Sequence, residues 1–310
     1  MSKKVVAITG GSGFIGSHLA QAHIKQGDEV RILSRGSGFI EGAYHYKGDL
    51  VDSGIENMKI LNSFIKDIDV IYHCAGELKN ESKMFELHVE GTERLLKLVK
   101  DKECRWVQLS SVGAYGVCTS GIITEKSKEN PSGIYEKTKL ISDNLVRKSG
   151  LPHTILRPSI VFGEKMNNRS LSQMIKIIKY RLFFYLSRDA VANYVHVDDV
   201  VSALILCSSH PKAISKTYIL SDSSKLETII NSIADALNVK RPKVRKPYFM
   251  VIIILKILSK FPKFPLSKQR IRALTNDCHY DATMIKSELE FALSKNLSNA
   301  FYKYAELFKK

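Results

Sequence analysis

The chain has 310 residues, of which 44% are apolar and 25% charged, and it carries a formal net charge of +16. A chain of this length and apolar content buries a large core, in one large domain or in two that pack closely. Positive charge of this size suits nucleic acid, an anionic membrane surface or an anionic small molecule as a partner. The lysines are spread along the whole chain rather than massed in one segment, so we expect no nucleic-acid partner.

The first predicted element is a short buried strand that ends in a glycine-rich turn. The run "KKVVAI" at 3–8 is rich in β-branched residues, and Gly10, Gly13 and Gly16 follow it three apart. Beyond them, apolar residues recur at helical spacing. A glycine turn between a strand and a helix directs backbone N–H groups and the positive helix end at an anion, so the pattern predicts a phosphate site. The turn comes so early that we expect no secretory signal.

Strands and helices alternate through the first half of the chain. Such alternation predicts a parallel sheet with helices on both faces, in which ligands bind at the carboxyl ends of the strands. We therefore predict an α/β fold, a Rossmann-like doubly wound parallel sheet that forms a dinucleotide-binding domain over residues 1–165. The predicted strands lie at 29–34, 43–48, 69–75, 105–111 and 153–158, and the predicted helices at 14–26, 82–101 and 133–149.

The second half is predicted to be a smaller, mainly helical substrate-binding region at 166–310, from which elements at about 190–220 can return to the sheet. Its most apolar stretch, residues 248–258, is shorter than the roughly 20 apolar residues that span a bilayer and is interrupted by Lys256. We predict a core helix there; a segment that lies on a membrane surface is the alternative. Helices are expected at 170–180, 225–238, 247–260, 267–275 and 296–309.

The five cysteines are scattered and odd in number. No pair has the spacing of a metal site, and this usage is typical of a reduced, cytoplasmic protein. We therefore expect reduced cysteines, no metal and a cytoplasmic location. The cysteines are Cys74, Cys104, Cys118, Cys207 and Cys278.

The end of the second predicted strand indicates which dinucleotide would bind. An acidic residue at this point binds the ribose hydroxyls of NAD, whereas an arginine accommodates the 2′-phosphate of NADP. Here the strand ends in Ser34 and Arg35, which can both donate to a phosphate. We predict NADP; the alternative is NAD, with Arg35 stacked on the adenine. Asp49, after the third strand, either accepts from the adenine amino group or caps a turn or helix.

A tyrosine and a lysine, Tyr135 and Lys139, occur four residues apart in "YEKTK" and share one face of the predicted helix. A phenol with a pKa near 10 is a weak base at neutral pH, but an ammonium within about 4–6 Å can lower the pKa of an acid by roughly 1–3 units. Ser111 ends the preceding strand, where its hydroxyl can orient a substrate oxygen. We predict these three as catalytic residues; for the tyrosine and the lysine, ordinary positions on a helix surface are the alternative.

A set of motifs, in this order, makes the chain similar to a known family. They are "TGGSGFIG" (9–16), "GDL" (48–50), "HCAGE" (73–77), "SSVGAYG" (110–116), "YEKTK" (135–139), "LRPSIVFG" (156–163) and "NYVHVDDVV" (193–201). The chain resembles the extended short-chain dehydrogenase/reductase family, in its NAD(P)-dependent epimerase/dehydratase group.

The resemblance implies roles for these residues. Tyr135 would be the acid/base, Lys139 would lower its pKa and hold the nicotinamide ribose, and Ser111 would bind the reacting oxygen. It also implies a homodimer through the helix at 133–149. The cofactor-binding residues that it implies, together with those from the strand ends, are Gly10, Gly13, Phe14, Ile15, Gly16, Ser34, Arg35, Asp49, Leu50, Cys74, Ala75, Gly76, Pro158 and Ile160.

Some positions are structural in this pattern, and others depart from it. The resemblance implies that His196 and Asp198–Asp199 cap the following helix. His88 stands where the family often has Asn, which leaves a supporting contact near the cofactor open. Dehydratases of the family carry Asp-Glu directly after the active-site hydroxyl residue, where this chain has Val112 and Gly113. We therefore do not expect water elimination.

The segment at 265–289 is similar to family members from bacterial surface-polysaccharide pathways, which act on UDP-linked amino sugars. The resemblance implies that Arg270 and Arg272 hold the diphosphate, with solvated helix faces as the alternative, and that Asn167 or Asn168 contacts the sugar or uridine. It also implies hydride transfer at C4 of a nucleotide sugar, by a reductase or an epimerase. The alternatives are a reductase of a hydrophobic alcohol or sterol and a non-catalytic NADP sensor.

Overall fold

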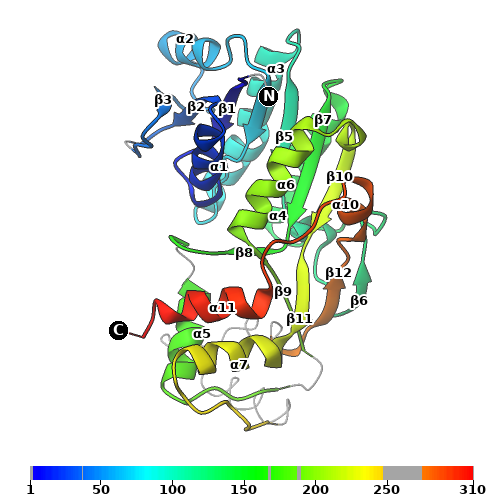
Figure 1. Ribbon diagram of the computed structural model, residues 1–310. Helices are drawn as coiled ribbons and strands as arrows, with labels where there is room; N and C mark the ends of the chain where they lie inside the picture. The colour runs from blue at the N-terminus through cyan, green and yellow to red at the C-terminus, as the bar shows by residue number, and fades with distance from the viewer. Residues whose placement is uncertain (1–2, 37, 167–168, 187–189, 247–273, 310) are drawn as a thin grey trace.

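Seven parallel strands form the central sheet (Figure 1). The computed structural model describes residues 3–36, 38–166, 169–186, 190–246 and 274–309. The strands lie in the order β10-β7-β5-β4-β1-β2-β3, so the direction of winding reverses between β1 and β4. In such sheets, ligands bind at this switch point, beyond the carboxyl ends of the strands. The strands are β1 (Val5–Thr9), β2 (Glu29–Ser34), β3 (Ala43–Lys47), β4 (Val70–His73), β5 (Arg105–Leu109), β7 (His153–Pro158) and β10 (Lys216–Leu220).

Helices cover both faces of this sheet. Helices α1 and α6 pack on one face, around apolar residues that include Leu19 and Val200, and α2, α3 and α4 pack on the other, around Leu61 and Leu95. Strand β4 is buried along its whole length, as is usual for a parallel strand covered on both sides. The helices are α1 (Phe14–Lys25), α2 (Ile55–Phe64), α3 (Gly91–Val99), α4 (Ile134–Lys148) and α6 (Val197–Ser209).

The predicted fold class is confirmed, and the helix predicted at 82–101 differs in detail. It is broken into a 3-10 helix (Glu81–Lys83), a π-helix (Glu86–Glu90) and α3. Helix α2 has no counterpart among the predicted elements. Further short 3-10 helices lie at Val112–Tyr115 and Pro211–Ala213.

Whereas α10 (Thr283–Glu288) packs beside β10 of the main sheet, most of the remaining elements form a smaller region, which lies below the main sheet in Figure 1. Its three-stranded sheet has the order β11-β9-β8, and its helices pack around Ile175, Ile229 and Phe301. Strand β10 comes late in the sequence but is the edge strand of the main sheet, parallel to β7. The second half of the chain therefore contributes to both regions. Further elements of the second half of the chain are β8 (Ile160–Phe162), α5 (Arg169–Lys179), β9 (Val191–His196), β11 (Asp222–Lys225), α7 (Leu226–Ala236), α10 (Thr283–Glu288) and α11 (Leu297–Glu306).

Part of the predicted substrate-binding region lies outside the described residues. This applies to the helix predicted at 247–260 and to most of the one predicted at 267–275. In the part of the chain that the structure describes, no helix is both long and apolar enough to cross a bilayer. The predicted features that lie outside are the apolar segment 248–258 and the candidate substrate residues Asn167, Asn168, Arg270 and Arg272.

A disulfide joins Cys118 to Cys278 and corrects the expectation of reduced cysteines. The two residues are 160 positions apart, but β6 (Ser120–Ile123) and β12 (Asp277–Tyr280) pair in parallel and bring them together. Only this long-range strand pairing makes the bond possible, and the spacing of the cysteines along the chain gives no sign of it. The free cysteines are Cys74, Cys104 and Cys207.

Candidate active site

The glycine-rich turn between β1 and α1 has a shape that only glycine permits. Gly10 has a φ of +66°, and a Cβ on it would lie 2.9 Å from the backbone of Ala75. A Cβ on Gly16 would lie 2.3 Å from the carbonyl oxygen of Gly10. Helix α1 begins after Gly13 with no side-chain cap and no acidic residue in its first turn, so its N–H groups are available to an anion. This cradle fits a dinucleotide pyrophosphate. The first turn of α1 also contains the candidates Phe14 and Ile15.

A pocket of about 280 Å³ lies beyond the ends of β2 and β3 and is lined by the candidates Arg35 and Asp49. The Oδ1 atom of Asp49 accepts the N–H of Val51 at 3.1 Å, so this carboxylate also shapes its own turn. The Ser34 hydroxyl donates to the carbonyl oxygen of Gly36 at 3.1 Å. Leu50, another candidate, is buried.

Most of the charge of this pocket comes from residues that were not among the predicted cofactor-binding residues. Asp52, Glu77, Lys83 and Glu86 line it together with Arg35 and Asp49. Four carboxylates against two cations give the lining a formal charge of −2. The N–H groups of the two residues after Leu78 donate to Glu77 and hold the pKa of its carboxyl below the ordinary value, so it is ionised at neutral pH.

Tyr135 and Lys139 lie in the first half of α4, which meets the sheet at the carboxyl end of β5. Lys139 is 4% exposed, and its Nζ donates to the carbonyl oxygen of Leu109 at 2.6 Å. Burial lowers the pKa of Lys139, and the neighbouring carboxylate of Asp143 opposes that shift. The bond to Leu109 ties α4 to the last residue of β5.

The phenol of Tyr135 is protonated at neutral pH in this structure. Burial, together with the smaller effect of the carboxylates of Glu136 and Asp143, raises its pKa to about 12. The expected lowering by Lys139 is not found, and the ammonium of that lysine bonds to the carbonyl oxygen of Leu109.

Ser111 lies two residues after the end of β5 and caps the 3-10 helix that follows. Its Oγ accepts the N–H of Gly113 at 3.1 Å. A Cβ on Gly113 would lie 2.7 Å from Cγ of Glu136, the residue after Tyr135. The turn that begins at Ser111 and the first turn of α4 are therefore in direct contact.

The loop after β4 adjoins both the glycine cradle and the π-helix Glu86–Glu90. Ala75 abuts the glycine turn, and burial raises the pKa of the Cys74 thiol to about 12, which leaves it inert. A Cβ on Gly76 would lie 3.6 Å from Nε2 of His88, so the loop rests on that imidazole. The remaining candidates are Pro158, the last residue of β7, and Ile160, the half-exposed first residue of β8.

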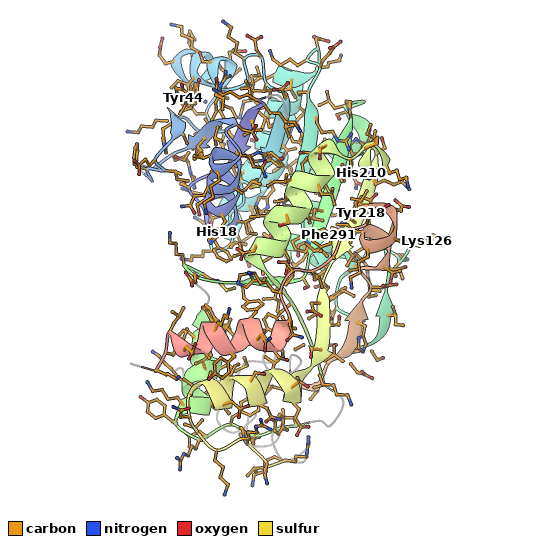
Figure 2. All side chains as sticks on the ribbon, in the orientation of Figure 1. His18, Tyr44, Lys126, His210, Tyr218 and Phe291 are labelled. Carbon is orange, nitrogen blue, oxygen red and sulfur yellow. A yellow bond between two sulfur atoms is a disulfide. The ribbon has the colours of Figure 1, made fainter. Side chains whose placement is uncertain are left out.

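A second cleft, of about 560 Å³, opens on the α1 and α6 side of the sheet and is lined by His18 (Figure 2). Two of its charges form an ion pair, since Lys295 lies 3.4 Å from Asp198. His196 accepts the N–H of Asp198 and caps α6, as predicted. Asp199 accepts the N–H and hydroxyl of Ser294. Across the described residues, no three His, Cys, Asp or Glu side chains gather as metal ligands.

Known proteins resemble this chain over most of its length. A UDP-glucose 4-epimerase of Lactobacillus helveticus is 25% identical over 244 residues, which are 68% of this chain and 74% of the relative. The sterol-4-alpha-carboxylate 3-dehydrogenase, decarboxylating, of Mus musculus is 22% identical over 283 residues, 83% of this chain and 75% of the relative. The crystal structure of UDP-glucuronic acid 4-epimerase from Bacillus cereus in complex with UDP-glucuronic acid and NAD has the same fold, with a TM-score of 0.73, 18% identity and coverage of 98% of this chain and 99% of that one. The model of the NAD dependent epimerase/dehydratase family matches residues 6–220, more than half of the sequence, and the chain belongs to this family.

Proposed function

We propose that the protein transfers hydride at C4 of a nucleotide-linked sugar, using a dinucleotide bound at the glycine cradle. The observation that carries this proposal is the contact between the Ser111 turn and the first turn of α4, at the same sheet edge as the cradle. The bound nicotinamide would accept and return the hydride. The phenol of Tyr135 exchanges the proton of the reacting hydroxyl, the Ser111 hydroxyl holds the sugar oxygen, and Lys139 binds the nicotinamide ribose.

The substrate class rests on the relatives. Two of the three similar proteins are named for UDP-sugars, so we propose a UDP-linked sugar, and an amino sugar within that class. A formal charge of +16 favours an anionic substrate of this kind. Val112 and Gly113 supply no acid or base for water elimination, so we propose epimerisation or reduction and not dehydration.

For the cofactor we propose NAD, in place of the NADP expected from Arg35. A 2′-phosphate in the pocket beyond β2 and β3 would meet Arg35 and Lys83 but also four carboxylates, and the lining is net negative. We expect NADH to bind at least about tenfold more tightly than NADPH in fluorescence titrations. A preference for NADPH would restore the prediction from the sequence.

The test of the reaction is incubation with UDP-glucose, UDP-N-acetylglucosamine and UDP-glucuronic acid, followed by NMR detection of the 4-epimer or of a 4-keto product. Tyr135→Phe should slow the reaction about 10²–10⁴-fold, because it removes the acid/base. Tyr44→Phe, on the exposed edge of the sheet (Figure 2), is the matched control and should react at the rate of the unmodified protein.

A hydrophobic alcohol is the second candidate substrate, because the mouse relative is named for a sterol. Turnover of a sterol alcohol with NAD, and of none of the UDP-sugars, would establish it. If Tyr135→Phe retained full biological activity, the reading as a non-catalytic dinucleotide sensor would replace both.

We also propose a homodimer that uses α4. Ile134 and Ile141 on this helix are 46% and 40% exposed, a site that a second copy can cover. Light scattering coupled to gel filtration should give twice the chain mass of 34.9 kDa. Ile141→Glu should then yield the monomer.

A cytoplasmic location remains the proposal from the sequence, and the disulfide is the observation that opposes it. Bonds such as Cys118–Cys278 are rare in reducing compartments. Thiol labelling of protein taken directly from cells would show whether these two cysteines are joined there.

A further inference from the structure

His88 is a buried imidazole that the proposed chemistry does not use directly. It is 1% exposed and lies in the π-helix Glu86–Glu90, between a 3-10 helix and α3. One-turn π-helices are rare and often occur at functional sites. Both ring nitrogens of His88 are hydrogen-bonded, each to a different part of the candidate active site.

The two bonds define the protonation of the ring. The backbone N–H of Glu77 donates to Nε2 of His88 at 2.8 Å, so Nε2 carries no proton. The other nitrogen, Nδ1, lies 2.8 Å from Oγ1 of Thr138. That hydroxyl is itself 3.0 Å from the carbonyl oxygens of Ile134 and Tyr135, to which it donates. Its oxygen therefore accepts from Nδ1–H, and the imidazole is neutral.

These bonds join the dinucleotide side of the site to the catalytic helix. Glu77 lies in the loop after β4, which adjoins the glycine cradle, whereas Thr138 lies between Tyr135 and Lys139 in α4. The ring of His88 also meets the ring of Tyr135 edge-on, with centroids 5.5 Å apart and an interplanar angle of 82°. One side chain thus contacts the loop, the helix and the proposed acid.

We propose that His88 is a positioning residue: its neutral imidazole sets the spacing between the dinucleotide loop and α4, and so places the Tyr135 phenol relative to the bound cofactor. The inference rests on the proposed function. The asparagine that the family often has at this position cannot place an acceptor as far from the backbone as Nε2, and it has no ring to set against Tyr135. The role is therefore specific to this chain.

Acid should break the hydrogen bond between Glu77 and His88, because a proton on Nε2 of His88 would face the backbone N–H of Glu77. Burial and, to a smaller extent, the ammonium of Lys139 lower the pKa of His88, the carboxylate of Glu77 opposes them, and the resulting pKa is about 4. The other titratable groups nearby are the Tyr135 phenol, protonated at neutral pH, and His73, whose pKa burial holds well below the ordinary value. At neutral pH the connection is intact.

The first test determines which ring nitrogen of His88 carries a proton, by NMR of protein labelled with ¹⁵N-histidine. The signals that disappear in His88→Asn belong to His88. We expect a protonated Nδ1 and an unprotonated Nε2, with no change from about pH 8 to about pH 5.5. A proton on Nε2, or a titration near the ordinary histidine pKa, would overturn the inference.

The second test measures NADH affinity by fluorescence titration. His88→Ala should weaken binding about tenfold, the effect of losing one well-made buried hydrogen bond. The side chain of His88→Gln carries both an acceptor and a donor and is longer than that of asparagine. This variant should recover most of the affinity for NADH. Thr138→Val should also weaken NADH binding. The loss of binding free energy in the double variant of His88→Ala and Thr138→Val should be smaller than the sum of the two single losses.

His23→Asn is the matched control. His23 is also buried and bonded through both nitrogens, to Asp28 and Tyr72, but it lies in α1 away from the loop and α4. This variant should lose stability without losing NADH affinity. If the unmodified protein binds neither NADH nor NADPH, the proposed function fails; if it binds NADH and His88→Ala binds equally well, the positioning role alone fails.

Discussion

The two sides of helix α4 are held in place by different chemistry. On the side toward α3, the contacts are neutral hydrogen bonds. Thr138 bonds to His88 at 2.8 Å, and the hydroxyl of Ser142 bonds to Thr92 and to the side-chain amide of Gln108, both at 2.9 Å. These groups are all buried and uncharged.

On the side toward β7, the contacts are ionic. The guanidinium of Arg157, 1% exposed, bonds to Asp143 at 2.8 Å and to Glu129 at 2.6 Å. Arg147 bonds to the same Glu129 at 2.8 Å, nearer the surface. The Arg157 guanidinium also lies 4.9 Å from the ring centroid of Tyr115.

The difference shows where the site tolerates charge. A buried ion is costly unless it is paired, and a charge beside a reacting phenol shifts the pKa of that phenol. The ionic side therefore anchors α4 to the sheet one turn or more beyond Tyr135, whereas His88 and Thr138, the groups nearest to Tyr135 on the other side, are neutral. Lys139, between the two sides, is the charged group that the proposed reaction itself uses.

The largest expected effect comes from breaking the ionic side at its buried carboxylate. Asp143→Ala leaves Arg157 buried with half of its partners, so the free energy of unfolding should fall by about 3–5 kcal/mol in urea titrations. Replacing both ions together, as Asp143→Leu with Arg157→Met, should recover much of that loss. A loss below about 1 kcal/mol in the single variant would show that the ionic side does not anchor the helix.

Acid should weaken the neutral side first. The unfolded chain binds a proton at His88 near pH 6.5, and the folded chain only near its pKa of about 4. Protons therefore favour the unfolded state in this window: stability is complete above about pH 6.5 and falls by roughly 3 kcal/mol from this residue as the pH drops to about 4. His88→Asn should flatten the slope of unfolding free energy against pH by about one proton.

The ionic side should respond in a lower pH range. Burial alone would raise the pKa of the Glu129 carboxyl, but the hydrogen bonds and charges of Arg147 and Arg157 hold it below the ordinary value. The stability that this carboxylate contributes is present above about pH 4.5 and is lost as the pH falls through its depressed pKa. A single steep loss below about pH 4.5, with nothing above it, would contradict the separation of the two sides.

A smaller loss of stability is expected when hydrogen bonds are removed from the neutral side of α4. Ser142→Ala removes the partner of both Thr92 and Gln108, and should lower the free energy of unfolding by about 1–3 kcal/mol because two buried polar groups lose a bond. Ser142→Thr, which keeps the hydroxyl, is the control. Unchanged stability in the alanine variant would mean that these bonds do not brace α4.

The elements on both sides of α4 could be predicted from the sequence, because each leaves a local signal. Parallel strands that are buried on both faces appear as short apolar runs, and the strands predicted at 29–34 and 153–158 match β2 and β7 residue for residue. The glycine turn and the spacing of Tyr135 and Lys139 are likewise local patterns. Their roles in binding and catalysis remain predictions.

The contacts between these elements leave no such signal. His88 bonds to residues 11 and 50 positions away, through a π-helix whose extra backbone width no periodicity reveals. The charge of the pocket around Arg35 depends on side chains from loops after three different strands. The end of one strand therefore predicts NADP, whereas the charges of the assembled pocket are the ground on which we propose NAD.

The smallest effect should come from the outer ion of the charged side. Arg147 is 32% exposed and Glu129 28%, and Glu129 keeps its bond to Arg157 when Arg147 is removed. Arg147→Ala should therefore cost less than about 1 kcal/mol, and salt should reduce that cost further, because water and ions screen exposed pairs. Urea titrations of the variant at low and at molar salt measure both quantities. A loss as large as that of Asp143→Ala would mean that the four charges act as one cooperative unit, and the buried Arg157–Asp143 pair could not then be treated as the separate anchor of α4.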